Sequence, residues 1–167
     1  MTATNQFSLA DRHGLKAPFA ALHHVALVTN DMEATVEFYR DVLGSEIAMA
    51  HRQGEHNVRH YFITVAPNTV FAFFEFRDAE MPEYLPPTKP KSGRSLDHIS
   101  FFLESRDDLD AWKSKLEGHG IEYSSMEVPG MVSAIFFSDP NNIVIELMVV
   151  PETGFNFPML DDPEPAY

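Results

Sequence analysis

LDHISFFL, residues 96–103, is the stretch that decides the fold, because it has a counterpart near the start of the chain, LHHVALV at residues 22–28. Its residues alternate like those of a half-buried strand, with His98, Ser100 and Phe102 on one face. His24 and His98 lie 74 residues apart, and so do the first residues of the two stretches. This pairing predicts an internal repeat.

The same order of elements follows each of the two stretches. In the first half the pattern predicts a helix at 32–43 and strands at 22–29, 46–51, 59–66 and 70–76. In the second half it predicts a helix around 109–116 and strands at 96–103, 121–128, 132–138 and 143–150. The sequence therefore predicts an α+β fold in which a β-α-β-β-β module occurs twice. We expect two curved sheets related by pseudo-twofold symmetry, with a helix behind each.

The repeat divides the chain into five segments. They are an N-terminal extension at 1–21 with a short helix near 8–14, the first module at 22–76, a proline-rich linker or active-site loop at 77–95, the second module at 96–150, and an acidic, proline-rich tail at 151–167.

Composition excludes several kinds of partner and site. The formal net charge of −13 argues against nucleic acid and anionic membrane surfaces. No apolar run is long enough to span a membrane, and the first residues lack the apolar segment of a signal peptide. We therefore expect a cytoplasmic protein that binds a small-molecule substrate. The absence of cysteine excludes disulfides and thiolate metal ligands.

Four side chains are candidate metal ligands. His24 and His98 lie on the first strand of each half, and Glu75 and Glu146 lie on the fourth. A carboxylate in a strand as apolar as 143–150 needs a cation, a donor or a proton. Two imidazoles and two carboxylates suit a divalent Fe, Mn, Co, Ni or Zn ion. The repeat predicts that these residues converge on one cavity.

Simpler interpretations of the same residues remain open. A single histidine in a strand is more often a core or edge residue than a ligand, and a glutamate in an apolar strand can pair with Arg59 or Arg94. Alternation places His23 on the face opposite His24, which indicates a structural role. The remaining histidines are expected at the surface, namely His51, His56, His60 and His119. His60 or Arg59 can nevertheless reach the cavity from the third strand.

Several motifs of the chain resemble those of the vicinal oxygen chelate superfamily, which includes glyoxalase I, extradiol dioxygenases and bleomycin-resistance proteins. The motifs span about residues 22–150 and are HVAL at 24–27, the helix at 32–43 with its FY and LG pairs, DHI at 97–99, and DPNNIVIEL at 139–147. The resemblance implies a cup of curved mixed sheets built from paired βαβββ modules. It also implies a metal in the cup and frequent formation of homodimers.

The leading functional hypothesis is a glyoxalase I-like lyase or isomerase. Members of that kind hold the metal with four ligands, which His24, Glu75, His98 and Glu146 match position by position. The metal there binds vicinal oxygens of the substrate and stabilises an enediolate while a carboxylate moves the proton. In this hypothesis Glu75 or Glu146 is the catalytic base. No basic residues for glutathione can be identified, so the substrate stays open.

Two other hypotheses follow from the same resemblance. A ring-cleaving extradiol dioxygenase uses iron held by two histidines and one carboxylate, which His24, His98 and Glu146 can supply. The chain departs from that pattern, since the usual tyrosine is Phe136, residues 127–129 offer no histidine, and the usual glycine is Asn142. The third hypothesis is a metal-free drug-binding protein, although such proteins typically lack the His/Glu quartet.

Overall fold

The computed structural model describes residues 19, 21–81 and 96–150. The expected short helix near 8–14, most of the proline-rich stretch with Arg94, and the acidic tail lie outside the described residues. Within the described part, no helix has the length and apolar character needed to cross a bilayer.

The first module contains one four-stranded sheet and one helical segment. Its elements are β1 (His24–Thr29), α2 (Met32–Glu37), η1 (Phe38–Val42), β2 (Ile47–Gln53), β3 (Val58–Ala66) and β4 (Thr69–Glu75). The strand order is β1-β4-β3-β2. β1 and β4 pair in parallel, while the other neighbours are antiparallel. The parallel pair places the first and last strands of the module side by side.

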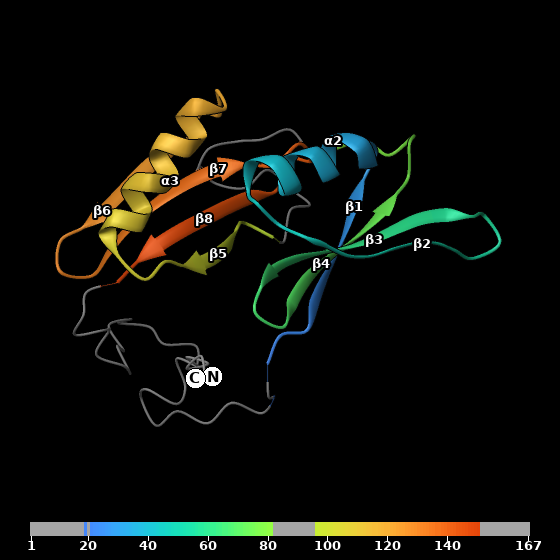
Figure 1. Cartoon of the computed structure of the whole chain (residues 1–167), viewed down its shortest axis with the longest axis horizontal. Coiled ribbons are helices and arrows are strands. Elements are labelled where there is room, and N and C mark those ends of the chain that lie inside the picture. Colours follow the sequence, from blue (N-terminus) through green and yellow to red (C-terminus); the bar gives the residue numbers. More distant parts are fainter. Residues whose placement is uncertain (1–18, 20, 82–95, 151–167) are drawn as a thin grey trace, which may run out of the picture.

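The second module repeats this arrangement. Its elements are β5 (Ile99–Phe102), α3 (Arg106–Gly118), β6 (Ser124–Val128), β7 (Val132–Ser138) and β8 (Val144–Val149). The strand order, β5-β8-β7-β6, matches that of the first sheet, and β5 and β8 are again parallel. The predicted fold of two βαβββ modules is therefore confirmed. Figure 1 shows the two mixed sheets next to each other.

Both helices begin at the residues that the sequence indicates. The Asp31 side chain accepts a hydrogen bond from Ala34 N, and the Ser105 side chain accepts one from Asp108 N. Such caps satisfy amide groups that have no partner within the helix. The single helix expected at 32–43 is interrupted, because its second half, Phe38–Val42, has π-helical hydrogen bonding. The local widening still leaves Phe38 and Tyr39 buried.

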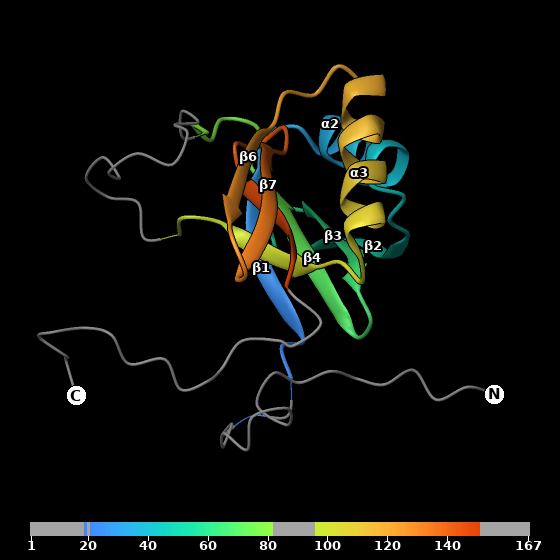
Figure 2. The same ribbon diagram turned by 90° about the vertical axis from the view of Figure 1, so that its left-hand side faces the viewer.

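The main core lies between the helices and one face of each sheet. Figures 1 and 2 show α2 and α3 on the same side of the two sheets. Fully buried side chains contribute about 1.5–3 kcal/mol each to stability. The core draws on both modules and contains, among others, Leu27, Tyr39, Phe71, Phe73, Leu116, Ile135, Phe137 and Ile145. The two modules of one chain are thus joined through their helix-covered faces.

The opposite faces of both sheets expose large apolar side chains. On the first sheet Val28 is 43% exposed and Met49 is 47% exposed. On the second sheet Phe102 is 51% exposed and Met126 is 39% exposed. Alternation and strand register place Val28 on the face that carries His24, and Phe102 on the face of Ser100 and its partner Glu146. We call these two surfaces the open faces of the sheets.

Candidate functional site

His98 and Glu146 meet on the open face of the second sheet. His98 immediately precedes β5, and Glu146 lies on β8 opposite Ser100. His98 Nε2 is 3.2 Å from Glu146 Oε2. Glu146 is only 6% exposed, between Ile145 and Leu147 in the strand. A carboxylate in such surroundings is costly without a partner, and the imidazole is the partner that the fold provides.

Asp97 orients the His98 ring. Its Oδ1 atom is 2.6 Å from His98 Nδ1, so the second ring nitrogen is directed at Glu146. Metal-binding histidines commonly use one nitrogen for a carboxylate and the other for the metal. The repeat spacing alone assigned no role to Asp97. The DH pair at 97–98 was the signal that could have identified it.

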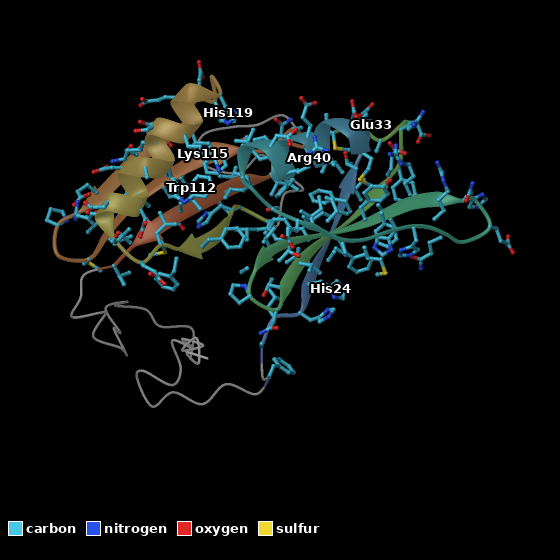
Figure 3. The ribbon with its side chains drawn as sticks, viewed as in Figure 1. His24, Glu33, Arg40, Trp112, Lys115 and His119 are labelled. Atoms are coloured by element: carbon cyan, nitrogen blue, oxygen red, sulfur yellow. The ribbon has the colours of Figure 1, made fainter. Side chains whose placement is uncertain are left out.

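His24 lies on the open face of the first sheet. Its Nδ1 atom is 2.8 Å from Nδ1 of His23, and its ring lies against Phe62 with centroids 6.5 Å apart. Figure 3 marks its position on β1. His23 and Asp97 occupy equivalent positions of the repeat, and each contacts Nδ1 of the histidine that follows it. The local arrangement around the two predicted histidine ligands is therefore similar.

One copy of the chain does not gather the predicted ligand set. Within 19, 21–81 and 96–150, no three or more His, Asp or Glu side chains are placed to hold a metal ion together. His98 and Glu146 form one pair, while His24 belongs to the other sheet.

Glu75 occupies the helix-covered face of the first sheet. It is paired with Thr29 in the sheet, whereas His24 is paired with Val70, five residues earlier on β4. An odd separation along a strand places side chains on opposite faces, so Glu75 and His24 point away from each other. Burial leaves Glu75 9% exposed.

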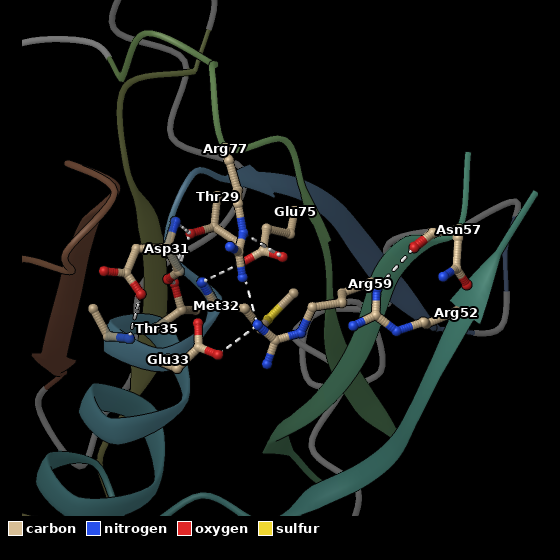
Figure 4. A network of polar contacts seen from close by, with 11 residues as sticks. Thr29, Asp31, Met32, Glu33, Thr35, Arg52, Asn57, Arg59, Glu75 and Arg77 are labelled. Atoms are coloured by element: carbon tan, nitrogen blue, oxygen red, sulfur yellow. Dashed lines mark hydrogen bonds and ion pairs between the residues drawn. The ribbon is translucent and has the colours of Figure 1, made fainter.

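The partners of Glu75 explain why its carboxylate is buried there. Its Oε1 atom accepts a hydrogen bond from Met32 N at 3.2 Å and lies 3.3 Å from Arg59 NH1. Its Oε2 atom lies 3.5 Å from Arg77 Nε. Figure 4 shows these groups around the start of α2. Glu75 thus has the arginine partner that the simpler interpretation of the sequence allowed.

Strand register identifies the counterpart of Glu146 in the first module. Glu146 is opposite Ser100, and the residue 74 positions before Ser100 is Ala26. Ala26 is opposite Ala72. The structure therefore places Ala72, not Glu75, where a fourth ligand would stand.

His60 is buried, contrary to the exposure expected from the sequence. It is 7% exposed, and its ring stacks on Phe74 with centroids 3.6 Å apart. Burial lowers its pKa, and the nearby rings of His51 and His24 lower it further. His56 and His119 are exposed as expected. Arg59 faces the helix-covered side with Glu75, so it does not reach the face of His24.

The described donors fit a divalent metal of the first transition series. Two imidazoles and a buried carboxylate are ligands that iron, manganese, cobalt, nickel and zinc accept. The orienting contacts at His24 and His98 leave the second ring nitrogen of each available for a metal.

The comparisons with known proteins agree with this fold. The model of the Glyoxalase/Bleomycin resistance protein/Dioxygenase superfamily matches residues 21–147. The uncharacterized protein YaeR of Escherichia coli is 25% identical over 130 residues, which are 75% of this chain and 93% of that protein. Biphenyl-2,3-diol 1,2-dioxygenase 3 of Rhodococcus globerulus is 27% identical over 128 residues, 77% of this chain and 62% of the enzyme.

Solved structures show the same fold at low identity. A glyoxylase/bleomycin resistance protein/dioxygenase domain from Frankia has a TM-score of 0.65 and 23% identity, over 80% of this chain and 94% of that one. A mutant of the fosfomycin resistance protein FosX from Listeria monocytogenes, complexed with Mn(II) and dihydroxypropylphosphonic acid, has a TM-score of 0.59 and 18% identity, over 77% of this chain and 91% of that one.

Proposed function

Because the chain belongs to the glyoxalase/bleomycin resistance protein/dioxygenase superfamily, we propose that it is a metal-dependent enzyme that binds a small substrate through two neighbouring oxygen atoms. The observation that carries the proposal is the contact of His98 Nε2 with the buried Glu146 Oε2, 3.2 Å apart. A histidine and a buried carboxylate side by side on an apolar sheet face support the assignment of this pair as two of the three proposed protein ligands.

Three side chains would hold the ion: His24, His98 and Glu146. Ala72 at the equivalent position of the first module removes the fourth protein ligand. Two histidines and one carboxylate leave coordination positions open for substrate oxygens. A bound divalent ion would act there as a Lewis acid, polarising a carbonyl or hydroxyl oxygen. Asp97 keeps the His98 ring in place, and the ring of Phe136 lies against it with centroids 5.5 Å apart.

The site would be completed by a second copy of the chain. The two modules of one copy meet through their helix-covered faces, which leaves both ligand-bearing faces open. Exposed apolar side chains on these open faces favour contact with another protein surface. In a twofold dimer the open first sheet of one copy can cover the open second sheet of its partner, and the reverse contact follows from symmetry. His24 of one copy would then complete the ligand set of the other.

Lewis-acid chemistry of the lyase or isomerase kind leads this proposal, with one change from the sequence-based hypothesis. Glu75 is surrounded by Arg59, Arg77 and the start of α2, so it is not proposed as a ligand or a base. Glu146 is the remaining carboxylate of the predicted set that lies beside a histidine.

A ring-cleaving dioxygenase is the second candidate, favoured by the three-ligand set and by the similarity to biphenyl-2,3-diol 1,2-dioxygenase 3. One observation weighs against it. Phe136 lies directly opposite Glu146, and its ring is 5.5 Å from that of His98. It has no hydroxyl group for proton transfer at this position.

The test is metal reconstitution followed by two assays. Protein purified without an affinity tag is loaded with Mn, Co, Ni, Zn or, without oxygen, Fe. It is then assayed for isomerisation of adducts between 2-oxoaldehydes and thiols, and for oxygen uptake with catechols. We expect metal-dependent turnover in the first assay. Oxygen uptake with the iron form alone would select the second candidate. Failure to bind any of these metals would contradict both and leave a metal-free binding protein.

A further inference from the structure

A separate pocket lies on the helix-covered side of the first sheet, and none of the proposed metal ligands lines it. It is an open hollow of about 380 Å³ whose polar lining includes Glu33, Arg52, Arg59, Tyr61 and Arg77. This size falls within the range of about 300–1,000 Å³ typical of small-molecule sites. Figure 4 shows its charged groups between the start of α2 and strands β2 and β3. Alternation places the side chains of Arg52, Arg59 and Tyr61 on the sheet face opposite that of His24, and His51 of β2 also lines the pocket.

The arrangement of arginines in this pocket is unfavourable by itself. Arg52 on β2 and Arg59 on β3 are directly opposite each other in the antiparallel pair. Like charges in this position destabilise a sheet. Arg77, just after β4, adds a third guanidinium to the same pocket. A chain with a formal net charge of −13 thus gathers positive charge at one place.

The carboxylates present neutralise this charge only in part. Buried Glu75 contacts both Arg59 and Arg77, and Glu33 contacts Arg59 at 2.6 Å. Among the described residues, no carboxylate forms an ion pair with Arg52, whose NH1 donates to the carbonyl of Asn57. The three positive charges therefore exceed the two negative ones by one.

A bound anion can displace the carboxylate of Glu33 from the pocket, but not that of Glu75. Its side chain is 67% exposed, whereas that of Glu75 is 6% exposed. An exposed ion pair contributes little to stability, so rotation of Glu33 into water has a small cost. Once Glu33 has moved away, Glu75 is the one carboxylate of the described residues that still pairs with these arginines, and their charge exceeds that of Glu75 by two. The guanidinium of Arg59 is held over the Tyr61 ring, 5.3 Å from its centroid, which keeps it in position.

We propose that this pocket binds the phosphate group of a small molecule, with Glu33 acting as an internal competitor for Arg59. A phosphate dianion matches the charge that remains when Glu33 leaves. Guanidinium groups bind phosphate oxygens through paired hydrogen bonds. The groups come from β2, β3 and the segment after β4, so they surround a tetrahedral group from several sides. The remaining volume accommodates the rest of the molecule.

The test uses inorganic phosphate as the probe on the full chain. Thermal unfolding is followed at about pH 8, where phosphate is a dianion, against sodium chloride of equal ionic strength. We expect a saturable rise in melting temperature with phosphate alone. Arg52→Gln should weaken phosphate binding about tenfold, the equivalent of one lost charge-assisted interaction. Glu33→Gln should strengthen it, because the competitor loses its charge.

Two controls make the outcome decisive. Arg106→Gln removes an exposed arginine that pairs with Glu127 in the second module, so it should leave phosphate binding unchanged. Acetate at equal ionic strength tests a carboxylate in place of phosphate. The proposal is overturned if phosphate stabilises no more than chloride, if acetate stabilises as well as phosphate, or if Arg52→Gln and Arg106→Gln behave alike. None of these substitutions touches the predicted metal ligands.

Discussion

Asp97 illustrates how a residue outside the predicted ligand set can control it. Its contact with His98 Nδ1 directs Nε2 toward Glu146. Asp97→Asn should therefore weaken metal binding about 10–100-fold while the fold is retained. Titration of the metal-free protein with Zn or Mn, followed by calorimetry, measures this. Asp107→Asn, an exposed change at the start of α3, is the matched control. Equal metal affinities of the two variants would mean that Asp97 does not orient His98 for metal binding.

His60 should make the stability of the protein dependent on pH. Its pKa in the folded state lies below its ordinary value of 6.5, first because of burial and then because of His51 and His24. Protonation therefore favours the unfolded chain, so stability is complete above about pH 6.5 and falls as the pH drops below it. The loss from this group can reach about 1.4 kcal/mol per pH unit.

Urea unfolding at pH 7 and pH 5 measures the contribution of His60. His60→Phe keeps an aromatic ring beside Phe74 and should show a smaller loss on acidification than the wild type. His56→Gln changes an exposed histidine and should show the wild-type loss. If His60→Phe loses as much stability as the other two proteins, the burial of His60 does not cause the pH dependence.

The repeat predicts His24, His98 and Glu146 as ligands, but the predicted pairing of Glu75 with Glu146 departs from its spacing. These two glutamates are 71 residues apart, whereas the repeat is 74. The difference of three is odd, and an odd shift along a strand moves a side chain to the other face. Alternation in β4 already grouped Glu75 with Phe71 and Phe73. The position 74 residues before Glu146 is Ala72, which is therefore its counterpart in the repeat.

At the scale of elements, a buried hydrogen-bond network joins the two modules. The Tyr39 hydroxyl, from the helical segment of the first module, donates to Oδ2 of Asp139, which immediately follows β7. Asn141 donates to Thr35 on α2 and also to Asp139. Because the Asp139 carboxylate is buried, each donor that it loses removes part of the hydrogen bonding that offsets the cost of its burial.

Tyr39→Phe removes one of these donors without changing the shape of the ring. We expect the free energy of unfolding to fall by about 1–3 kcal/mol. Urea denaturation followed by circular dichroism measures the change. Tyr123→Phe removes an exposed hydroxyl that contacts Glu117 and should change stability by less than about 0.5 kcal/mol. A Tyr39→Phe effect as small as this control would mean that the network does not hold the modules together.

Most elements were predictable because local signals and the repeat agreed. Asp31 and Ser105 mark the helix starts, and Gly44 ends the first helical segment with a φ of +80°. Asn142, which departs from the glycine usual in the family, has a φ of +59° and tolerates the same left-handed conformation. The π-helical turn at Phe38–Val42 was not predictable, because the apolar spacing of 32–43 is that of an ordinary helix.

At the scale of the whole molecule, the proposed metal site needs ligands from two copies of the chain. Local sequence cannot show this, because it does not reveal whether modules of one chain meet through their open or their helix-covered faces. The core of one copy unites the helix-covered faces, and the open faces keep exposed apolar side chains. We therefore expect a homodimer in light-scattering measurements.

A mixing experiment tests whether the ligands come from two copies. His24→Ala and Glu146→Ala should each abolish metal binding on their own. After the two variants are unfolded and refolded together, half of the dimers are mixed, and each mixed dimer has one complete site. Metal content should therefore recover to about a quarter of the wild-type value. Metal content that stays at zero would place His24 and Glu146 of one site in the same copy.

The most direct test of the three-ligand site compares the metal content of Glu75→Gln and Glu146→Gln with that of the wild type. Metal content is measured by mass spectrometry, and circular dichroism verifies that each variant is folded. We expect Glu75→Gln to keep the wild-type metal content, because Glu75 contacts Arg59 and the start of α2. We expect Glu146→Gln to lose the metal. A folded Glu75→Gln protein without metal, or a Glu146→Gln protein with full metal content, would contradict the three-ligand site.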